Sequence, residues 1–249
     1  MRAPVSILLA AAAFCLSIAP AARAQADATF AKANADFAAG NSSAAIKGYE
    51  SLVKNRQWSA SLFYDLGNAY FRAGDRGRAI LNYERALALD PSQPEAKANL
   101  RLARDQARAL ELAPNRVEEH LDYLTRNQYA WLGVTAFWAT VAIFCGLCFA
   151  RRRAVVWIFA LVLSGTVCVG AAGAVYALEK GRSGRNVAIV IGKNVQARIA
   201  TAESANTVLL LPPGSEVRIL DTRGDWIYAD LPNDLQGWIP TRSAEMVRL

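Results

Sequence analysis

The sequence has few of the residues on which many catalytic and metal sites depend. Its 249 residues include one histidine, His120, four cysteines and two methionines. A Ser/His/Asp triad requires a histidine beside its nucleophile, and zinc sites usually draw on several histidines or cysteines. His120 lies in a polar stretch beside Glu118 and Glu119, as a solvated or interfacial histidine would. We therefore expect a non-enzymatic protein with no catalytic residues, no metal and no cofactor.

The sequence also lacks a strongly basic region, although its net charge is +7. Residues 27–126 hold 14 basic and 13 acidic side chains, and residues 179–249 hold 9 and 8. Residues 127–178 hold three arginines and no acid. Because a phosphate-binding surface needs concentrated positive charge, this distribution argues against a nucleic-acid partner.

Cysteine is absent from residues 25–126 and from residues 187–249, so disulfides cannot hold either segment together. Cys145 and Cys148 form a C-x-x-C in a long apolar run, a spacing that can indicate redox chemistry or metal binding. A thiol surrounded by lipid lacks the electropositive, accessible setting of a reactive cysteine. We therefore interpret these cysteines as apolar filler.

Residues 1–24 have the layout of a secretory signal peptide. A basic start is followed by an apolar run over 7–18 and by Ala22-Arg23-Ala24, which predicts cleavage between Ala24 and Gln25. An uncleaved anchor is the alternative, but the run is short for a bilayer span. The mature chain is therefore expected to begin outside the cytoplasm.

A repeat with a period of 34 residues follows. Asn-Ala-Asp-Phe-Ala-Ala-Gly at 34–40 recurs as Asn-Ala-Tyr-Phe-Arg-Ala-Gly at 68–74. The second copy carries large, small and helix-stopping residues in the order typical of the tetratricopeptide repeat (TPR), which has this length: Phe63, Leu66, Gly67, Tyr70, Ala79, Tyr83, Ala86 and Pro91. The segment 25–126 thus resembles a TPR domain, with repeats over 26–59 and 60–93.

The run over 94–112 is predicted to be a helix that ends the array, its arginines facing solvent. In such an array the first helix of each repeat lines a groove. Helical spacing predicts the following candidate protein-binding residues on that face: Tyr64, Asn68, Phe71, Arg72, Asn34 and Phe37. The lysine of the carboxylate-clamp subtype is missing, because Tyr64 stands in its place in the second repeat. A ligand held by its C-terminal carboxylate is therefore not expected.

Two uncharged runs, 127–150 and 154–178, are each long enough to cross a bilayer as a helix. Only the three arginines at 151–153 separate them, so we predict a tight transmembrane hairpin with a cytoplasmic turn. Combined with the signal peptide, this predicts a bacterial inner-membrane protein with two spans and with both flanking domains in the periplasm.

Residues 187–249 change to short apolar runs separated by turns, which predicts a small β-barrel. Strands are expected at 188–191, 195–198, 208–211, 216–220, 226–229 and 236–239. The order of glycines and aromatics resembles a bacterial SH3-like (SH3b) domain, and these residues carry the resemblance: Gly214, Val217, Gly224, Trp226, Tyr228, Gly237, Trp238 and Ile239. We expect Trp226 and Trp238 in the core rather than in a binding surface.

The complete order is an α-plus-β chain: signal peptide, TPR array, two-helix hairpin, SH3b-like barrel. This order resembles the BatE-type proteins of bacterial aerotolerance operons. The resemblance implies partners among von Willebrand factor A (vWA)-domain membrane proteins and a MoxR-type AAA+ ATPase, in envelope stress or aerotolerance.

Two functions remain open, and a third is disfavoured. The leading one is a membrane-anchored scaffold that recruits protein partners through the TPR groove. The alternative is a cell-wall sensor or tether that binds peptidoglycan through the SH3b-like barrel. An enzyme such as a wall hydrolase would need an activated nucleophile or a metal with a matched base, and the sequence offers neither.

Overall fold

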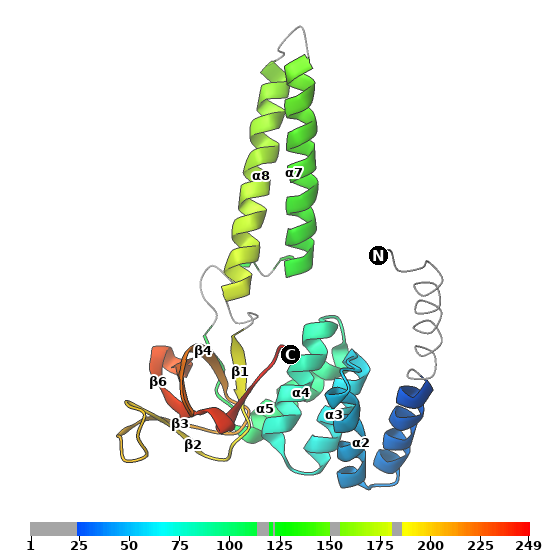
Figure 1. The fold of residues 1–249 in the computed structure, drawn as a ribbon, viewed down its shortest axis with the longest axis vertical. Helices are drawn as coiled ribbons and strands as arrows, with labels where there is room; N and C mark the ends of the chain where they lie inside the picture. Colours follow the sequence, from blue (N-terminus) through cyan, green and yellow to red (C-terminus); the bar gives the residue numbers. More distant parts are fainter. Residues whose placement is uncertain (1–23, 114–119, 122, 150–154, 181–185) are drawn as a thin grey trace, which may run out of the picture.

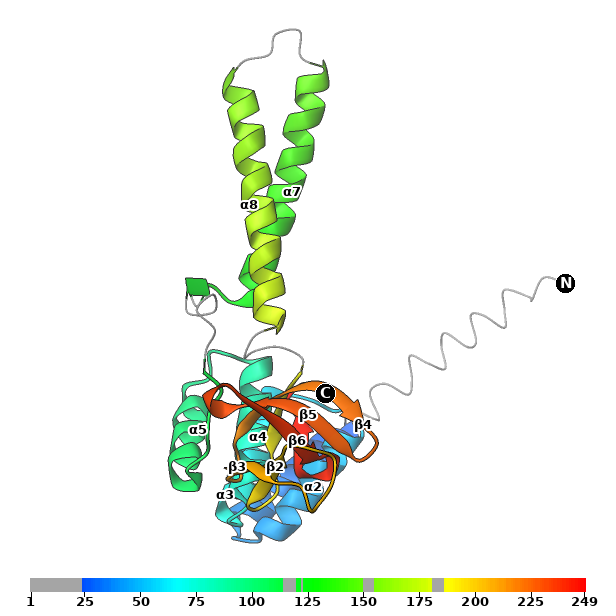
Figure 2. The same ribbon diagram turned by 90° about the vertical axis from the view of Figure 1, so that its left-hand side faces the viewer.

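The computed structural model describes residues 24–113, 120–121, 123–149, 155–180 and 186–249 (Figure 1). A helical array and a C-terminal β domain lie side by side at one end of a long two-helix hairpin (Figure 1, Figure 2). The predicted signal peptide, apart from residue 24, and the three-arginine turn lie outside the described residues. The chain is therefore α plus β, with three structural parts.

The array begins with a helix over residues 24–38 and continues with α2 (Ser42–Lys54), α3 (Ala60–Arg72), α4 (Arg76–Leu89) and α5 (Pro94–Ala107). Side chains cap two of these helices: Ser59 accepts from the Leu62 N–H, and Asp75 accepts from the Arg78 N–H. Gly40 and Gly74, one period apart, have φ of 85° and 81° just beyond a helix end. This left-handed conformation favours glycine and terminates a helix.

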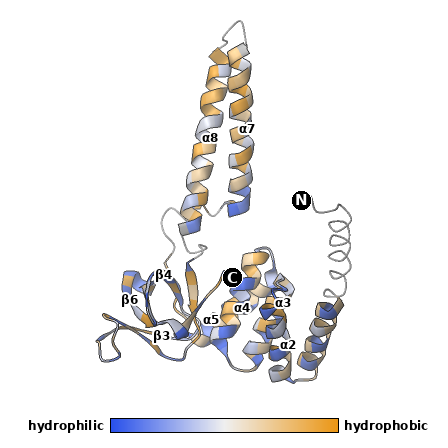
Figure 3. Cartoon of the chain, viewed as in Figure 1, coloured by the Kyte–Doolittle hydropathy of each residue, from blue (hydrophilic) through white to orange (hydrophobic). Residues whose placement is uncertain are grey.

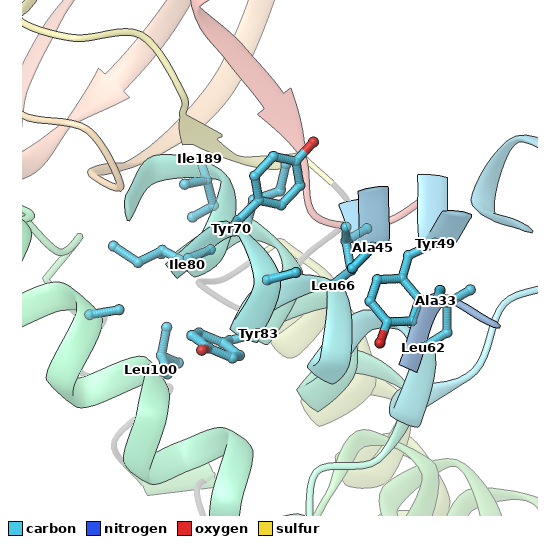
Figure 4. Packing of buried hydrophobic residues seen from close by; sticks show 14 of the residues in the cluster. Ala33, Ala45, Tyr49, Leu62, Leu66, Tyr70, Ile80, Tyr83, Leu100 and Ile189 are labelled. Carbon is cyan, nitrogen blue, oxygen red and sulfur yellow. The ribbon is translucent and has the colours of Figure 1, made fainter. Parts of the chain in front are cut away.

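The core of the array is built from the positions that repeat along the sequence. Tyr49 and Tyr83 are fully buried, and both belong to one apolar cluster with Leu62, Leu66 and Ile80 (Figure 4). At Gly67 the helices approach so closely that a Cβ there would lie 2.7 Å from the Tyr83 ring. Glycine is therefore required at this crossing by space rather than by backbone conformation.

The hairpin consists of α7 (Arg126–Phe149) and α8 (Val155–Lys180), both apolar along most of their length (Figure 3). Both are long and apolar enough to cross a membrane, and only 6% of each apolar window is buried within the protein. Between them Thr140 Oγ1 donates to Ser164 Oγ at 2.9 Å, and at the base Arg126 pairs with Glu179 at 2.7 Å. These contacts hold the two helices against each other at mid-length and at the base.

The β domain is one antiparallel sheet of seven strands: β1 (Val187–Val190), β2 (Val195–Arg198), β3 (Thr207–Leu211), β4 (Glu216–Arg223), β5 (Trp226–Leu231), β6 (Leu235–Pro240) and β7 (Ala244–Met246). Their order in the sheet is β3-β2-β6-β5-β4-β1-β7. Single-turn 3-10 helices at Pro232–Asp234 and Thr241–Ser243 precede β6 and β7. The seventh strand was not expected from the sequence, because three residues are too few to show a period.

The two tryptophans expected in the core of this domain are not there. Strand β5 alternates between half-buried and buried positions, and Ile227, Ala229 and Leu231 are its buried members. Since successive side chains point to opposite faces of a sheet, Trp226 lies on the outer face. Trp238 lies outward on β6 for the same reason, next to the buried Ile239. The expectation was wrong because smaller aliphatic side chains already fill the core.

The sequence suggested that the arginines of α5 face solvent, but not all of them do. Arg104 is 12% exposed and forms ion pairs with Glu84 of α4 and Glu216 of β4. The helix itself ends at Ala107, with Arg108 in the left-handed conformation, and the chain then passes along the β domain. Arg104 therefore contacts the C-terminal domain, whereas Arg101 and Arg108 are exposed as expected.

Candidate functional site

The candidate protein-binding site is the face formed by helix 24–38, α3 and α5. These are the first helices of successive repeats, and we call their shared surface the first-helix face. Its polar side chains are held by hydrogen bonds that recur with the repeat. Tyr49 Oη donates to Asn34 Oδ1 at 2.6 Å, and Tyr83 Oη donates to Asn68 Oδ1 at 2.8 Å.

Both tyrosines remain donors at neutral pH. Burial raises the pKa of Tyr49 to about 12, and the nearby Asp65 carboxylate adds to the effect. Burial raises the pKa of Tyr83 as well, with a smaller contribution from Tyr64. Each phenol therefore keeps its proton and fixes the asparagine of its repeat.

A third helix extends this network. Asn99 Nδ2 of α5 donates to Asn68 Oδ1 at 3.0 Å and to Tyr64 Oη at 3.2 Å. The Asn68 oxygen thus accepts from two protein donors, and in the described part of the chain no hydrogen bond uses its Nδ2. A ligand can therefore be expected to meet Asn68 as a donor rather than as an acceptor.

A second link crosses from repeat one to repeat two. Arg72 Nη1 donates to the Phe37 carbonyl at 2.8 Å, and its guanidinium carbon lies 4.3 Å from the centre of the Phe37 ring. Arg72 is exposed while Phe37 and Phe71 are half-buried. The pair presents a cation stacked on an aromatic ring, a combination frequent in recognition surfaces.

The structure thus joins the predicted residues into two groups. Tyr64 and Asn68 share the network with Asn99, whereas Arg72 contacts Phe37. Asn34 repeats the role of Asn68 one period earlier. Phe71 packs partly against the core.

Sequence reasoning missed two polar residues near this network, Asn99 and Asp65. They are one period apart, so an alignment of the final helix with the repeats would have indicated both. Burial raises the pKa of Asp65 above its ordinary value of 3.8. Among the described residues it has no salt bridge, so its carboxylate is not neutralised by a neighbouring cation.

The outer face of the β domain offers a second candidate surface, which we call the aromatic strip: Trp226, Tyr228, Trp238 and Arg223. The Tyr228 and Trp238 rings are 5.0 Å apart, and the Arg223 guanidinium carbon lies 5.4 Å from the Trp238 ring centre. At one end, Tyr228 Oη donates to Gln236 Oε1 and Gln236 Nε2 donates to Asp230. The strip is an aromatic surface bordered by hydrogen-bonding groups.

A cavity of about 500 Å³ lies where the hairpin base meets the array and the β domain. Its charged lining is used in ion pairs: Glu84 and Glu216 with Arg104, and Arg126 and Arg248 with Glu179. The cavity therefore marks a junction between parts of the chain.

The described residues contain no cluster of three histidine, cysteine, aspartate or glutamate side chains that could hold a metal ion. Cys145 and Cys148 are exposed on the hairpin surface, and Cys168 is half-buried.

Comparison with known proteins agrees with the repeat geometry. A search of curated proteins found no match to the chain. The family model of the tetratricopeptide repeat matches residues 60–93, the segment that comprises α3, α4 and the turn after them.

Proposed function

We propose that this protein is a non-enzymatic, membrane-anchored scaffold that recruits a protein partner through the first-helix face. TPR repeats indicate a protein-interaction role, and two apolar helices are suited to membrane anchoring. The observation that supports the choice of face is the array of groups across three helices. It combines the Arg72–Phe37 stack with the Asn68 amide and the Tyr64 ring.

We further propose that the chain is a BatE-type protein of a bacterial inner membrane, with both flanking parts in the periplasm. Its partners would then be vWA-domain membrane proteins linked to a MoxR-type AAA+ ATPase, in envelope stress or aerotolerance. The array and the β domain touch each other at one end of the hairpin. That arrangement agrees with both parts lying on one side of the membrane.

Site-specific photo-crosslinking in native membranes tests this proposal. A photoreactive residue at Arg72 or Tyr64 should capture one defined partner, and one at exposed Lys54 on α2 should not. The substitution Asn68→Asp, made in the chain that carries the photoreactive residue, keeps the oxygen that accepts hydrogen bonds from Tyr83 and Asn99 but removes the Nδ2 donor. It should reduce capture while leaving the helical circular dichroism unchanged. Equal capture from all three positions would contradict recognition at this face.

A second candidate function is favoured by the aromatic strip. We propose, as the alternative, that the β domain is SH3b-like and tethers the protein to peptidoglycan through Trp226 and Trp238. The outward position of these side chains is the observation that raises this alternative. Trp238→Ala should then abolish co-sedimentation of the detergent-solubilised protein with purified peptidoglycan. Unchanged sedimentation of that variant would remove the alternative.

A further inference from the structure

Helix α5 occupies the place of the first helix in a third repeat, and the residues directly after it, 108–113, are not helical. We propose that the C-terminal β domain takes the place of the second helix of that repeat and completes the TPR array, although the membrane hairpin separates the two in sequence. The array and the β domain would then form one folding unit. The proposal is independent of what the first-helix face binds.

The apolar core of the array continues into the β domain. Ile189 of β1 has no exposed surface and belongs to the same cluster as Tyr70 and Ile80 of the array (Figure 4). Ile191 and Val247 pack against that cluster from the same side. In the opposite direction, Leu110, just after α5, packs against the core of the β domain. Each part therefore supplies side chains to the core of the other.

The two parts approach so closely that each contributes a glycine at the contact. A Cβ at Gly77 of α4 would lie 3.1 Å from Ile191 Cα and from the Val190 oxygen. A Cβ at Gly214, which has φ of 89°, would lie 2.2 Å from Ile80 Cδ1. The Gly214 N–H also donates to the Val190 oxygen. The three atoms nearest to a Cβ at Gly77 all belong to Val190 and Ile191 of the β domain.

Buried charges cross the same contact. Arg104 of α5 pairs with Glu216 of β4, which is 3% exposed, and with Glu84 of α4. Arg85 of α4, 8% exposed, donates to the Met246 carbonyl at 2.9 Å and lies 3.4 Å from Glu245. Breaking a buried ion pair leaves an uncompensated charge and is strongly destabilising. These pairs therefore tie the stability of α4 and α5 to the presence of the β domain.

The backbone after α5 is bound to β4. The Glu216 N–H donates to the Leu110 carbonyl at 2.9 Å, and the Leu110 N–H donates to Ser215 Oγ at 3.1 Å. The Leu112 N–H donates to Glu216 Oε2 at 3.2 Å. Apolar, ionic and main-chain contacts thus coincide at one surface between the array and the β domain.

Hydrogen exchange on the full-length protein in detergent tests the proposal. Arg104→Leu lies in the array and should speed exchange of β1 and β4 amides, while Ile189→Ala lies in the β domain and should speed exchange of α4 and α5. We expect about tenfold or more in each case, because local opening reports the lost contacts. Arg101→Leu, an exposed change on the same helix, is the control and should alter neither. If each variant affects only its own part, the proposal is wrong.

Cleavage of the chain provides a second test, and its main measurement uses the wild-type sequence outside the inserted site. A specific protease site is inserted within 181–185 of the full chain, and the purified protein is cut. The released segment 186–249 should still co-elute with the rest of the chain on gel filtration. Arg104→Leu should release it. If segment 186–249 of the cleaved wild-type protein separates from the rest of the chain, the proposal is wrong.

Discussion

At the scale of single residues, the choice of amino acid is most restricted where one added atom would clash with a neighbouring side chain. Gly67 is the clearest case, because the Tyr83 ring occupies the space that a side chain would need. Gly67→Leu should lower the free energy of unfolding by about 1–3 kcal/mol, the usual cost of overpacking. Thermal melting followed by circular dichroism measures it. Ser43→Leu, exposed on α2, adds a leucine without this contact and should melt with the wild type.

Asp65 supports a prediction about pH. Burial raises the pKa of this carboxyl above 3.8, so the folded state favours its protonated form. Its contribution to stability is full below the unfolded pKa and is lost as pH rises through the folded pKa. Asp65→Asn should therefore raise the melting temperature at pH 7, and the gain should shrink as the pH falls toward 4. A gain that is the same at both pH values would show that ionisation of Asp65 does not limit stability.

At the scale of elements, strands β5 and β6 each have one face in the core of the β domain and one face on its surface. On β6, the inward Ile239 is fully buried, whereas Trp238 beside it is half-buried on the outer face. Ile239→Ala should cost about 2–5 kcal/mol of stability, as large-to-small core changes do. Trp238→Ala should cost clearly less. If the tryptophan variant proves the more destabilising in denaturant titrations, the outer face carries the fold.

For the helices, the sequence predicts where they lie but not which surfaces they contact. The 34-residue period predicts where α3 and α4 lie, and the matched family segment agrees. It does not indicate that Arg104 of α5 would pair with a strand from beyond the hairpin. In the sequence the arginines of α5 resemble those of any solvated helix, and only the positions of Glu84 and Glu216 in the fold distinguish Arg104 from Arg101.

At the scale of the whole molecule, the three parts meet at the base of the hairpin. Glu179 at the end of α8 pairs with Arg126 of α7 at 2.7 Å and with Arg248 near the C-terminus at 3.7 Å. Arg248 is thus paired with α8, and the same Glu179 carboxylate pairs with α7.

This arrangement leads to a prediction about membrane topology. Since the array and the β domain contact each other, both must lie on the same side of any membrane that the hairpin crosses. A reporter active only in the cytoplasm, fused after Leu249, should be silent, and one active only in the periplasm should be active. The opposite pair of results would contradict the proposed periplasmic location.

The parts of this protein that could be predicted from its sequence are those that depend on short-range periodicity. The repeat over 60–93, the two apolar helices and most strands follow from residue spacing, because helices and strands impose periods of 3.6 and 2 on their buried side chains. The candidate residues Asn68 and Arg72 could be named for the same reason, although their contacts with Asn99 and Phe37 could not. Tertiary structure alone decided that Trp226 and Trp238 face outward and that Ile189 enters the core of the array. Both depend on which surfaces meet across long stretches of chain, and such contacts leave no period in the sequence.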